Sequence, residues 1–259
     1  MRTALAAARA GADVLTRVGL PRPGGRADLK NAGDYVTSTD HASEAAILEV
    51  LAHEAPGIAV LAEEGGGTRA ATMWAVDPLD GTTNFIHGYA QVGVSVGLLQ
   101  EGMPVLGVVI GPFLGLEIAG AVGRGVTRNG ERIPPLGPGV PDRAVVATGF
   151  PFRHKERLPR YLPVMQGAIE RFEDLRRAGS AALDLAFTAA GILDGFFELG
   201  LGTWDVAGGA ALVLAAGGVV TDWSGGDSWI ETGDILAGPP AVHAELLRIV
   251  GSRASHGGA

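Results

Sequence analysis

The chain has no cysteine and no long apolar run, and each absence excludes a class of protein. Without cysteine there is no disulfide, no thiolate nucleophile and no cysteine-ligated zinc or iron–sulfur site. The longest apolar stretch, residues 206–220, is shorter than the roughly 20 residues that span a bilayer. A formal net charge of -8 argues against nucleic acid or an anionic membrane as a partner. We therefore expect a cytoplasmic protein that binds neither nucleic acid nor membrane.

Two common nucleotide-binding motifs are also missing. Neither Lys30 nor Lys155 follows a glycine, so there is no G-K-[ST] phosphate loop, and no G-x-G-x-x-G dinucleotide motif occurs. The six histidines fall in no zinc-binding spacing, and we expect surface positions for most of them. P-loop nucleotide hydrolysis and dinucleotide binding are thereby excluded.

What is present is the composition of a globular protein, with 47% hydrophobic and 19% charged residues. Before residue 134 the pattern predicts helices over 2–18 and 38–53, separated by a Pro/Gly/Arg-rich loop through Gly33. Apolar runs and alternating segments predict a mostly antiparallel sheet with strands near 58–62, 73–76, 92–109 and 116–122. Breaks at Glu101-Gly102 and Asn129-Gly130 predict hairpin turns within it.

The second half of the chain has a different pattern. Residues 134–141, PPLGPGVP, form the clearest linker in the sequence. Beyond it, predicted strands alternate with predicted helices, which is typical of an α/β arrangement. The strands are expected at 144–147, 195–198, 219–222 and 234–237, and the helices at 157–172, 180–190, 205–216 and 241–251. We predict two domains, residues 1–135 and residues 136–259.

One catalytic motif matches the sequence but not its context. Residues 93–97 read G-V-S-V-G, the pattern of the nucleophile elbow in serine hydrolases. The elbow places its serine on a sharp turn between a strand and a helix. Here Val94, Val96 and Leu98 alternate straight through Ser95, which indicates a serine in the middle of a strand. A serine hydrolase is thus kept only as a third alternative.

The acidic residues carry more information. An apolar strand at 73–76 leads into Asp77 and Asp80, two carboxylates three residues apart. Taken alone, Asp-Pro and Asp-Gly are common turn sequences. However, Pro78 stiffens the link between the carboxylates, and Gly81 allows close approach of the backbone to a ligand. Residues from Gly81 onward could begin a helix whose free N–H groups accept a phosphate. Carboxylates plus a backbone carbonyl are the ligands of a hard cation such as Mg²⁺.

Further acids follow in similar contexts. Glu63 and Glu64 end the predicted strand at 58–62, and alone they would be a solvated loop. Asp40 and Asp205 lie at predicted helix starts, where an acid is usually only a cap. Each of these simpler interpretations is favoured individually. Their joint occurrence in this order favours a shared metal site.

This combination resembles the inositol monophosphatase family of Mg²⁺-dependent, Li⁺-sensitive sugar-phosphate phosphatases. The resemblance covers nearly the whole chain, and the blocks at 77–85 (DPLDGTTNF) and 204–207 (WDVA) are highly specific. The other matching segments are DYVTSTD (34–40), AEE (62–64), ATGFPF (147–152), RAGSAA (177–182) and FFELG (196–200). The resemblance implies a layered αβαβα sandwich, α+β and α/β in character, with an antiparallel sheet in the N-terminal half and a mixed sheet in the C-terminal half.

The resemblance also implies roles for individual residues. The metal ligands would be Glu63, Asp77, the Leu79 carbonyl, Asp80 and Asp205. The catalytic residues would be Glu63, Thr82 and Asp40, the last two orienting the attacking water. The substrate-binding residues would be Asp80, Gly81, Thr82, Ala181, Glu198 and Asp205. Lys30 would lie in a loop that closes over the site.

The implied function is hydrolysis of inositol-1-phosphate, or a similar polyol or sugar monophosphate, by water activated by two or three Mg²⁺ ions. The resemblance further implies a homodimer with no nucleic-acid or membrane partner. Fructose-1,6-bisphosphate, histidinol phosphate and 3′-phosphoadenosine 5′-phosphate remain alternative substrates, because relatives share the metal motif. Arg176 or Arg177 could accept the second phosphate of a bisphosphate. A non-catalytic sugar-phosphate binder is a further alternative.

Overall fold

The computed structural model describes residues 1–21, 28–31 and 34–254 of the chain. The two predicted N-terminal helices are confirmed as α1 (Arg2–Val18) and α2 (Ser38–Glu54), which pack side by side. Gly11 permits this packing, because a Cβ there would lie only 2.7 Å from Cδ1 of Ile47. Where the sequence predicted a loop, β1 (Asp28–Asn31) and β2 (Asp34–Val36) form a small antiparallel sheet. The Lys30 side chain lies outside the described residues.

The first large sheet has eight strands in the order β10-β9-β8-β7-β6-β5-β3-β4. Neighbouring strands are antiparallel except for β3 and β5, which run parallel. The strands are β3 (Ala59–Ala62), β4 (Gly66–Gly67), β5 (Thr72–Asp80), β6 (Gly93–Gln100), β7 (Met103–Gly111), β8 (Leu116–Ala121), β9 (Gly125–Arg128) and β10 (Glu131–Arg132). The predicted antiparallel sheet is therefore present in the N-terminal half.

Both predicted hairpin turns occur where the sequence placed them. Glu101 and Gly102 connect β6 to β7 with φ angles of 48° and 77°, and Asn129 and Gly130 connect β9 to β10 with 51° and 82°. Two consecutive positive φ angles define the two-residue turn whose twist matches the flanking strands. Asn-Gly adopts this turn readily, since asparagine and glycine tolerate the left-handed region.

The second sheet has five strands in the order β12-β11-β13-β15-β14. It is mixed, because β11 runs parallel to β12 and β13 whereas β15 is antiparallel to β13 and β14. Its strands are β11 (Val145–Thr148), β12 (Asp174–Arg176), β13 (Gly195–Glu198), β14 (Val219–Thr221) and β15 (Ile235–Gly238). The helices of this half are α4 (Leu158–Arg171), α5 (Ala181–Ala189), α6 (Thr203–Ala215), α7 (Trp229–Thr232) and α8 (Pro240–Ala254). The short elements β12 and α7 were not predicted.

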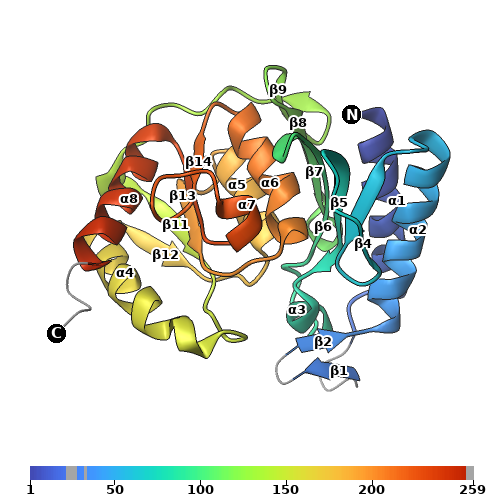
Figure 1. The fold of residues 1–259 in the computed structure, drawn as a ribbon, viewed down its shortest axis with the longest axis horizontal. Coiled ribbons are helices and arrows are strands. Elements are labelled where there is room, and N and C mark those ends of the chain that lie inside the picture. The colour runs from blue at the N-terminus through green and yellow to red at the C-terminus, as the bar shows by residue number, and fades with distance from the viewer. Residues whose placement is uncertain (22–27, 32–33, 255–259) are drawn as a thin grey trace.

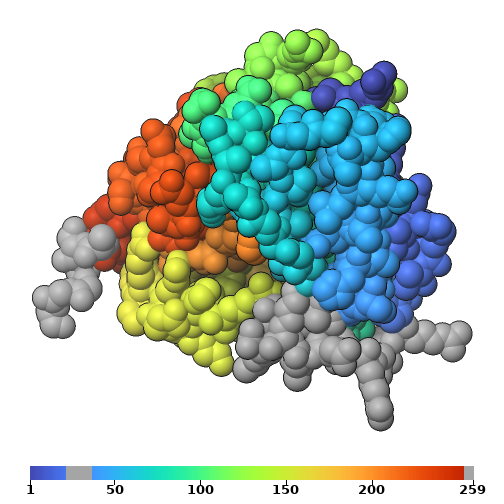
Figure 2. All heavy atoms as spheres, turned by 45° about the vertical axis from the view of Figure 1, so that its right-hand side comes forward, coloured from blue at the N-terminus to red at the C-terminus, as the bar shows by residue number. Residues whose placement is uncertain are grey.

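These elements form five layers, as Figure 1 shows. Helices α1 and α2 cover one face of the eight-stranded sheet, α5 and α6 lie between the two sheets, and α4 and α8 cover the far face of the five-stranded sheet. Three apolar clusters hold the layers together: one lies between α1, α2 and the first sheet, one surrounds α5 and α6 and reaches both sheets, and one lies between the second sheet and α4 and α8. In Figure 2 the blue helices α1 and α2 lie on the opposite side of the molecule from the red and orange C-terminal elements. The predicted αβαβα sandwich is confirmed.

Within the described part of the chain, the 3-10 turns are η1 (Pro112–Leu114), η2 (Pro141–Arg143) and η3 (Lys155–Arg157). Among the described residues, none of the helices combines the length and apolar character required to cross a bilayer.

Candidate functional site

Strand β5 ends in the Asp-Pro-Leu-Asp segment, and a bulge there aims its acids at one cavity. Asp77 pairs with Ser95 while Asp80 pairs with Gly93, so the register shifts between the two aspartates. Such a bulge bends a strand and redirects its side chains. Gly81 then turns the chain at φ 96° into α3 (Thr82–Ile86). A Cβ at Gly81 would lie 2.9 Å from the Gln91 carbonyl, so the turn requires glycine.

Asp205 comes to the same place from the other half of the chain. It lies in the first turn of α6, where its Oδ2 accepts a 2.6 Å hydrogen bond from the Gly202 N–H. The sequence suggested a helix cap, and this bond does fasten the helix start. One carboxylate oxygen from each of Asp77, Asp80 and Asp205 lies within 4.8 Å of the other two. Asp205 therefore completes a three-carboxylate cluster.

Glu63 reaches the cavity from a neighbouring strand. Strand β3 runs parallel to β5 with its last residue, Ala62, opposite Val76, so Glu63 and Asp77 come next at the same level of the sheet. Glu63 follows directly and lines the cavity together with Asp77, Asp80 and Asp205. Burial, reinforced by the Asp205 carboxylate, raises the pKa of Glu63 to about 8. This value is typical of a carboxyl group surrounded by other acids.

The cluster is electrostatically unfavourable without a cation. Burial and the Asp205 carboxylate raise the pKa of Asp80 to about 7. Burial and the Glu63 carboxylate raise the pKa of Asp77 well above its usual range. Asp77 Oδ1 accepts a 3.0 Å bond from the Leu79 N–H, but its buried Oδ2 has no donor among the described residues. These oxygen atoms fit a hard divalent cation, which would satisfy Oδ2 and offset the repulsion.

Thr82 and Asp40 face each other beside this cluster. The Thr82 hydroxyl lies 3.2 Å from Asp40 Oδ1 and 3.3 Å from the Leu79 carbonyl oxygen, both of which can accept its proton. Asp40 is fully buried, and its Oδ2 accepts bonds from the N–H and hydroxyl of Thr37. Burial, the largest influence, raises the pKa of Asp40. The structure thus places a hydroxyl paired with a carboxylate next to the acidic cluster.

The acids form one end of a cavity of about 850 Å³ that is lined by residues of both halves of the chain. Ala181 and Glu198 line another part of it, and Gly149 leaves room for Glu198, since a Cβ there would lie 2.0 Å from Glu198 Oε1. Burial and the Asp184 carboxylate raise the pKa of Glu198. Sequence reasoning missed Asp184, whose buried Oδ1 has no hydrogen-bond partner among the described residues. The sequence signal for Asp184 was a single charged residue in α5, whose other residues are apolar apart from Thr188.

The two neighbouring arginines have different environments. Both are exposed, but Arg176 forms an ion pair with Asp174 at 2.5 Å. Arg177 lines the cavity, and its guanidinium carbon lies 5.6 Å and 5.3 Å from the ring centroids of Phe150 and Phe152. Among the described residues, Arg177 makes no hydrogen bond or ion pair. Of these two arginines, Arg177 is therefore the one placed to meet a molecule in the cavity.

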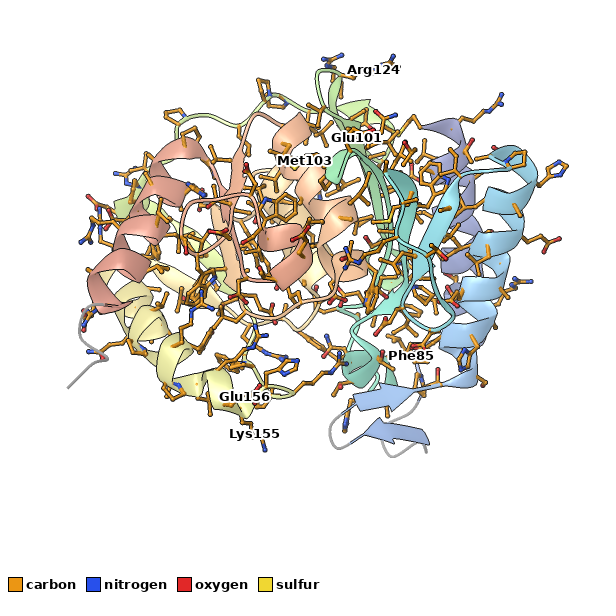
Figure 3. All side chains as sticks on the ribbon, viewed as in Figure 1. Phe85, Glu101, Met103, Arg124, Lys155 and Glu156 are labelled. Carbon is orange, nitrogen blue, oxygen red and sulfur yellow. The ribbon has the colours of Figure 1, made fainter. Side chains whose placement is uncertain are left out.

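Other sequence candidates have structural explanations. Ser95 is buried in the middle of β6, so it lacks the exposed turn that a nucleophile elbow requires. His154 lines the cavity mouth and lies 3.2 Å from Glu156. Lys155, the first residue of η3, also lines the cavity, although the end of its side chain points outward in Figure 3.

The fold and the site define a class of layered αβαβα proteins in which a cavity carries a cluster of carboxylates suited to a divalent cation. Within that class, the chain belongs to the inositol monophosphatase family, whose model matches residues 1–254. It is 41% identical over 228 residues to a protein of Pseudomonas aeruginosa named Nus factor SuhB, covering 85% of this chain and 84% of that protein. The Pasteurella multocida protein of the same name is 37% identical over 250 residues, covering 95% and 94%.

Two solved structures are similar throughout. The extragenic suppressor protein suhB of Bartonella henselae matches with a TM-score of 0.88 and 34% identity, covering 96% of this chain and 97% of that one. The inositol monophosphatase of Anabaena matches with a TM-score of 0.86 and 36% identity, covering 97% and 95%. The family assignment therefore rests on both sequence and structure.

Proposed function

We propose that the protein is a Mg²⁺-dependent phosphomonoesterase acting on inositol-1-phosphate or a similar polyol or sugar monophosphate. The observation that carries the proposal is the convergence of Asp77, Asp80 and Asp205 within 4.8 Å, with Glu63 lining the same cavity. Four acids that line one cavity repel one another, and that repulsion is relieved by protonation or by a bound cation. Family membership supports a phosphatase.

Each residue at this end has a distinct task in the proposal. Glu63, Asp77, the Leu79 carbonyl, Asp80 and Asp205 would hold the cations, two or three in number. Bound Mg²⁺ supplies positive charge that stabilises the phosphate and lowers the pKa of the attacking water. Thr82 and Asp40 orient that water, because the hydroxyl lies 3.2 Å from the Asp40 carboxylate that accepts its proton. The amides of Gly81 and Thr82 hold the phosphate.

The rest of the cavity would select the alcohol part of the substrate. Asp80, Ala181, Glu198 and Asp205 line it, and the Glu198 carboxylate can accept hydrogen bonds from vicinal hydroxyls. Arg177 supports the alternative of fructose-1,6-bisphosphate, since it offers positive charge in the cavity. Histidinol phosphate and 3′-phosphoadenosine 5′-phosphate also remain candidates. In this proposal residues 1–135 and 136–259 form the two halves of a cytoplasmic, Li⁺-sensitive homodimeric enzyme.

A second candidate is a non-catalytic role in a larger assembly. Its support is the name Nus factor, which several relatives carry. A binder that had lost catalysis would be free to lose cation ligands. This chain keeps Glu63, Asp77 and Asp205 in one cavity, which favours an enzyme.

The test is phosphate release from a panel of sugar and polyol phosphates, with and without Mg²⁺. We expect inositol-1-phosphate to be turned over, and excess chelator to abolish turnover until Mg²⁺ is restored. Asp77→Asn should be inactive, while Asp227→Asn, which changes an exposed acid, should match the wild type. Full activity in chelator, or no turnover of any ester with Mg²⁺ present, would contradict the proposal.

A further inference from the structure

Helix α2 turns three buried polar side chains toward the acidic end of the cavity. Ser43 and Glu44 follow Asp40 by three and four residues, about one helical turn, so all three side chains lie on one face of the helix. Each is at most 5% exposed, and each forms a hydrogen bond outside α2. Asp40 accepts from Thr82, and the Ser43 hydroxyl donates to the Pro78 carbonyl at 2.8 Å.

Glu44 makes the most specific of these contacts. Its Oε2 accepts a 2.9 Å hydrogen bond from the Glu64 N–H, and its Oε1 accepts a 2.7 Å bond from the Gly65 N–H. These are consecutive amides of the tight turn that joins β3 to β4 and begins with Glu63. Gly65 fits closely, because a Cβ there would lie 2.7 Å from Glu44 Oε1.

We propose that Glu44 is a positioning residue for the cation site: by fixing the turn at residues 63–65, it holds the Glu63 carboxylate in the cavity and raises divalent-cation affinity. This inference rests on the proposed function only in taking Glu63 as a ligand. The other acids repel Glu63, so a loose turn would let its side chain leave the cluster. An anchor on the adjacent amides prevents this, and such outer partners commonly set metal affinity.

The chemistry requires a carboxylate at this position. Each of the two N–H groups meets its own oxygen in the structure, and a carboxylate offers both oxygens as acceptors. Glutamine has one acceptor oxygen, and its NH₂ group would face the second N–H. Glu44→Gln therefore loses one hydrogen bond and sets a donor against a donor, with almost no change of size.

The experiment measures Mg²⁺ binding to metal-free protein by calorimetry, with no substrate present. We expect Glu44→Gln to weaken the tightest binding event about 10–100-fold. At saturating Mg²⁺, kcat should recover most of its wild-type value, because Glu44 does not touch the substrate. The control is Glu49→Gln, the same charge change at an exposed position of α2, which should bind Mg²⁺ as the wild type does. Wild-type affinity in a folded Glu44→Gln protein would overturn the proposal.

Two further measurements keep the test decisive if Glu44→Gln does not fold. Gly65→Ala perturbs the same contact from the other side and should weaken Mg²⁺ binding in the same direction. Hydrogen exchange of the metal-free wild type should show protected amides at Glu64 and Gly65, and unprotected amides would refute the anchor. If the wild type itself binds no divalent cation, the proposed function fails; if it binds and the variants bind equally, only the role of Glu44 fails.

Discussion

The two ends of the cavity differ in how their polar side chains are held. At the acidic end, Asp80 Oδ2 accepts 2.7 Å bonds from the Ser180 hydroxyl and the Ala182 N–H, and Asp205 is bonded to Gly202. At the other end, Asp184, Glu198 and Arg177 line the cavity without a side-chain hydrogen bond to any described residue. Asp80 and Asp205 at the acidic end are fastened by the protein, with Asp77 Oδ2 the exception, whereas all three side chains named at the other end have unused hydrogen-bonding capacity.

This difference indicates that the acidic end carries out the reaction and that the other end selects the substrate. Groups that stabilise a transition state act best when they are fixed in advance. Groups that recognise a substrate discriminate best when they are left unpaired without it, because a ligand lacking the right partner leaves them unsatisfied. We therefore expect changes at the acidic end to affect all phosphate esters equally. Changes at the other end should affect only esters with the matching alcohol.

The largest expected effect is that of Asp205→Asn, because Asp205 is the acid that joins the two halves of the chain at the cluster. Removing a cation ligand should cost several kcal/mol of transition-state stabilisation, a fall in kcat/KM of about 10³-fold. Asparagine keeps an oxygen to accept the Gly202 N–H, so α6 should begin unchanged.

The measurement is kcat/KM for inositol-1-phosphate and p-nitrophenyl phosphate, with Mg²⁺ affinity by calorimetry and Asp227→Asn as the control. Equal losses on both esters are expected. A loss confined to inositol-1-phosphate would show that Asp205 recognises the alcohol part of the substrate and is not needed for the reaction itself.

Thr82→Ala should have the next largest effect, a fall in kcat of about 10²-fold, at the low end of the range for acid–base groups. Thr82 carries no charge, so Mg²⁺ affinity should be unchanged. Thr82→Ser keeps the hydroxyl that faces Asp40 and should restore most of kcat. If Thr82→Ala instead weakened Mg²⁺ binding and left kcat at saturation unaltered, its hydroxyl would be supporting the cation ligands.

Much of the fold could be predicted because its signals are local. The helix over 2–18 and the turn at Asn129-Gly130 follow from periodicity and turn chemistry within a few residues. The short elements were missed for the same reason: β12 has three residues and α7 has four, too few to show a period. The resemblance to a family supplied the order of the layers, which local patterns alone do not determine.

The acidic residues of the site could be named from motifs, but their supports could not. In the sequence, nothing distinguishes Glu44 from other acidic residues of a helix, because its partners are the backbone N–H groups of Glu64 and Gly65, 20 and 21 residues away. Arg176 and Arg177 are indistinguishable in sequence, and only the packing against Phe150 and Phe152 separates them. Contacts of this kind depend on tertiary structure, so no short pattern encodes them.

At the specificity end, Glu198→Gln should raise KM for inositol-1-phosphate about tenfold, the cost of weakening a hydrogen bond to a charged acceptor. The values of kcat and KM for p-nitrophenyl phosphate should stay the same, because that ester has no hydroxyl to recognise. Steady-state kinetics on both esters decide the matter. Equal changes on the two would show that Glu198 supports the cation site.

A smaller, selective effect is expected from the paired variants Arg177→Met and Arg176→Met. Loss of the cavity-lining guanidinium should lower kcat/KM for fructose-1,6-bisphosphate by about three- to tenfold, as expected for one exposed charge contact. Arg176 pairs with Asp174 outside the cavity, so its variant should match the wild type on the same ester. Equal kcat/KM values for the two variants would show that Arg177 does not take part in substrate recognition.

The smallest effect concerns pH and the metal-free protein. The pKa values of Glu63 and Asp80 are raised to about 8 and about 7, well above those of an unfolded chain. Between pH 5 and 8 the folded state therefore binds more protons than the unfolded state, and the free energy of unfolding falls as pH rises. We expect the Tm of the metal-free protein to fall across this window. Mg²⁺ should reverse the fall, since cations replace the lost protons. Glu63→Gln should flatten the profile, whereas Glu49→Gln should leave it unchanged; a Tm that rises with pH would contradict this account of the acidic end.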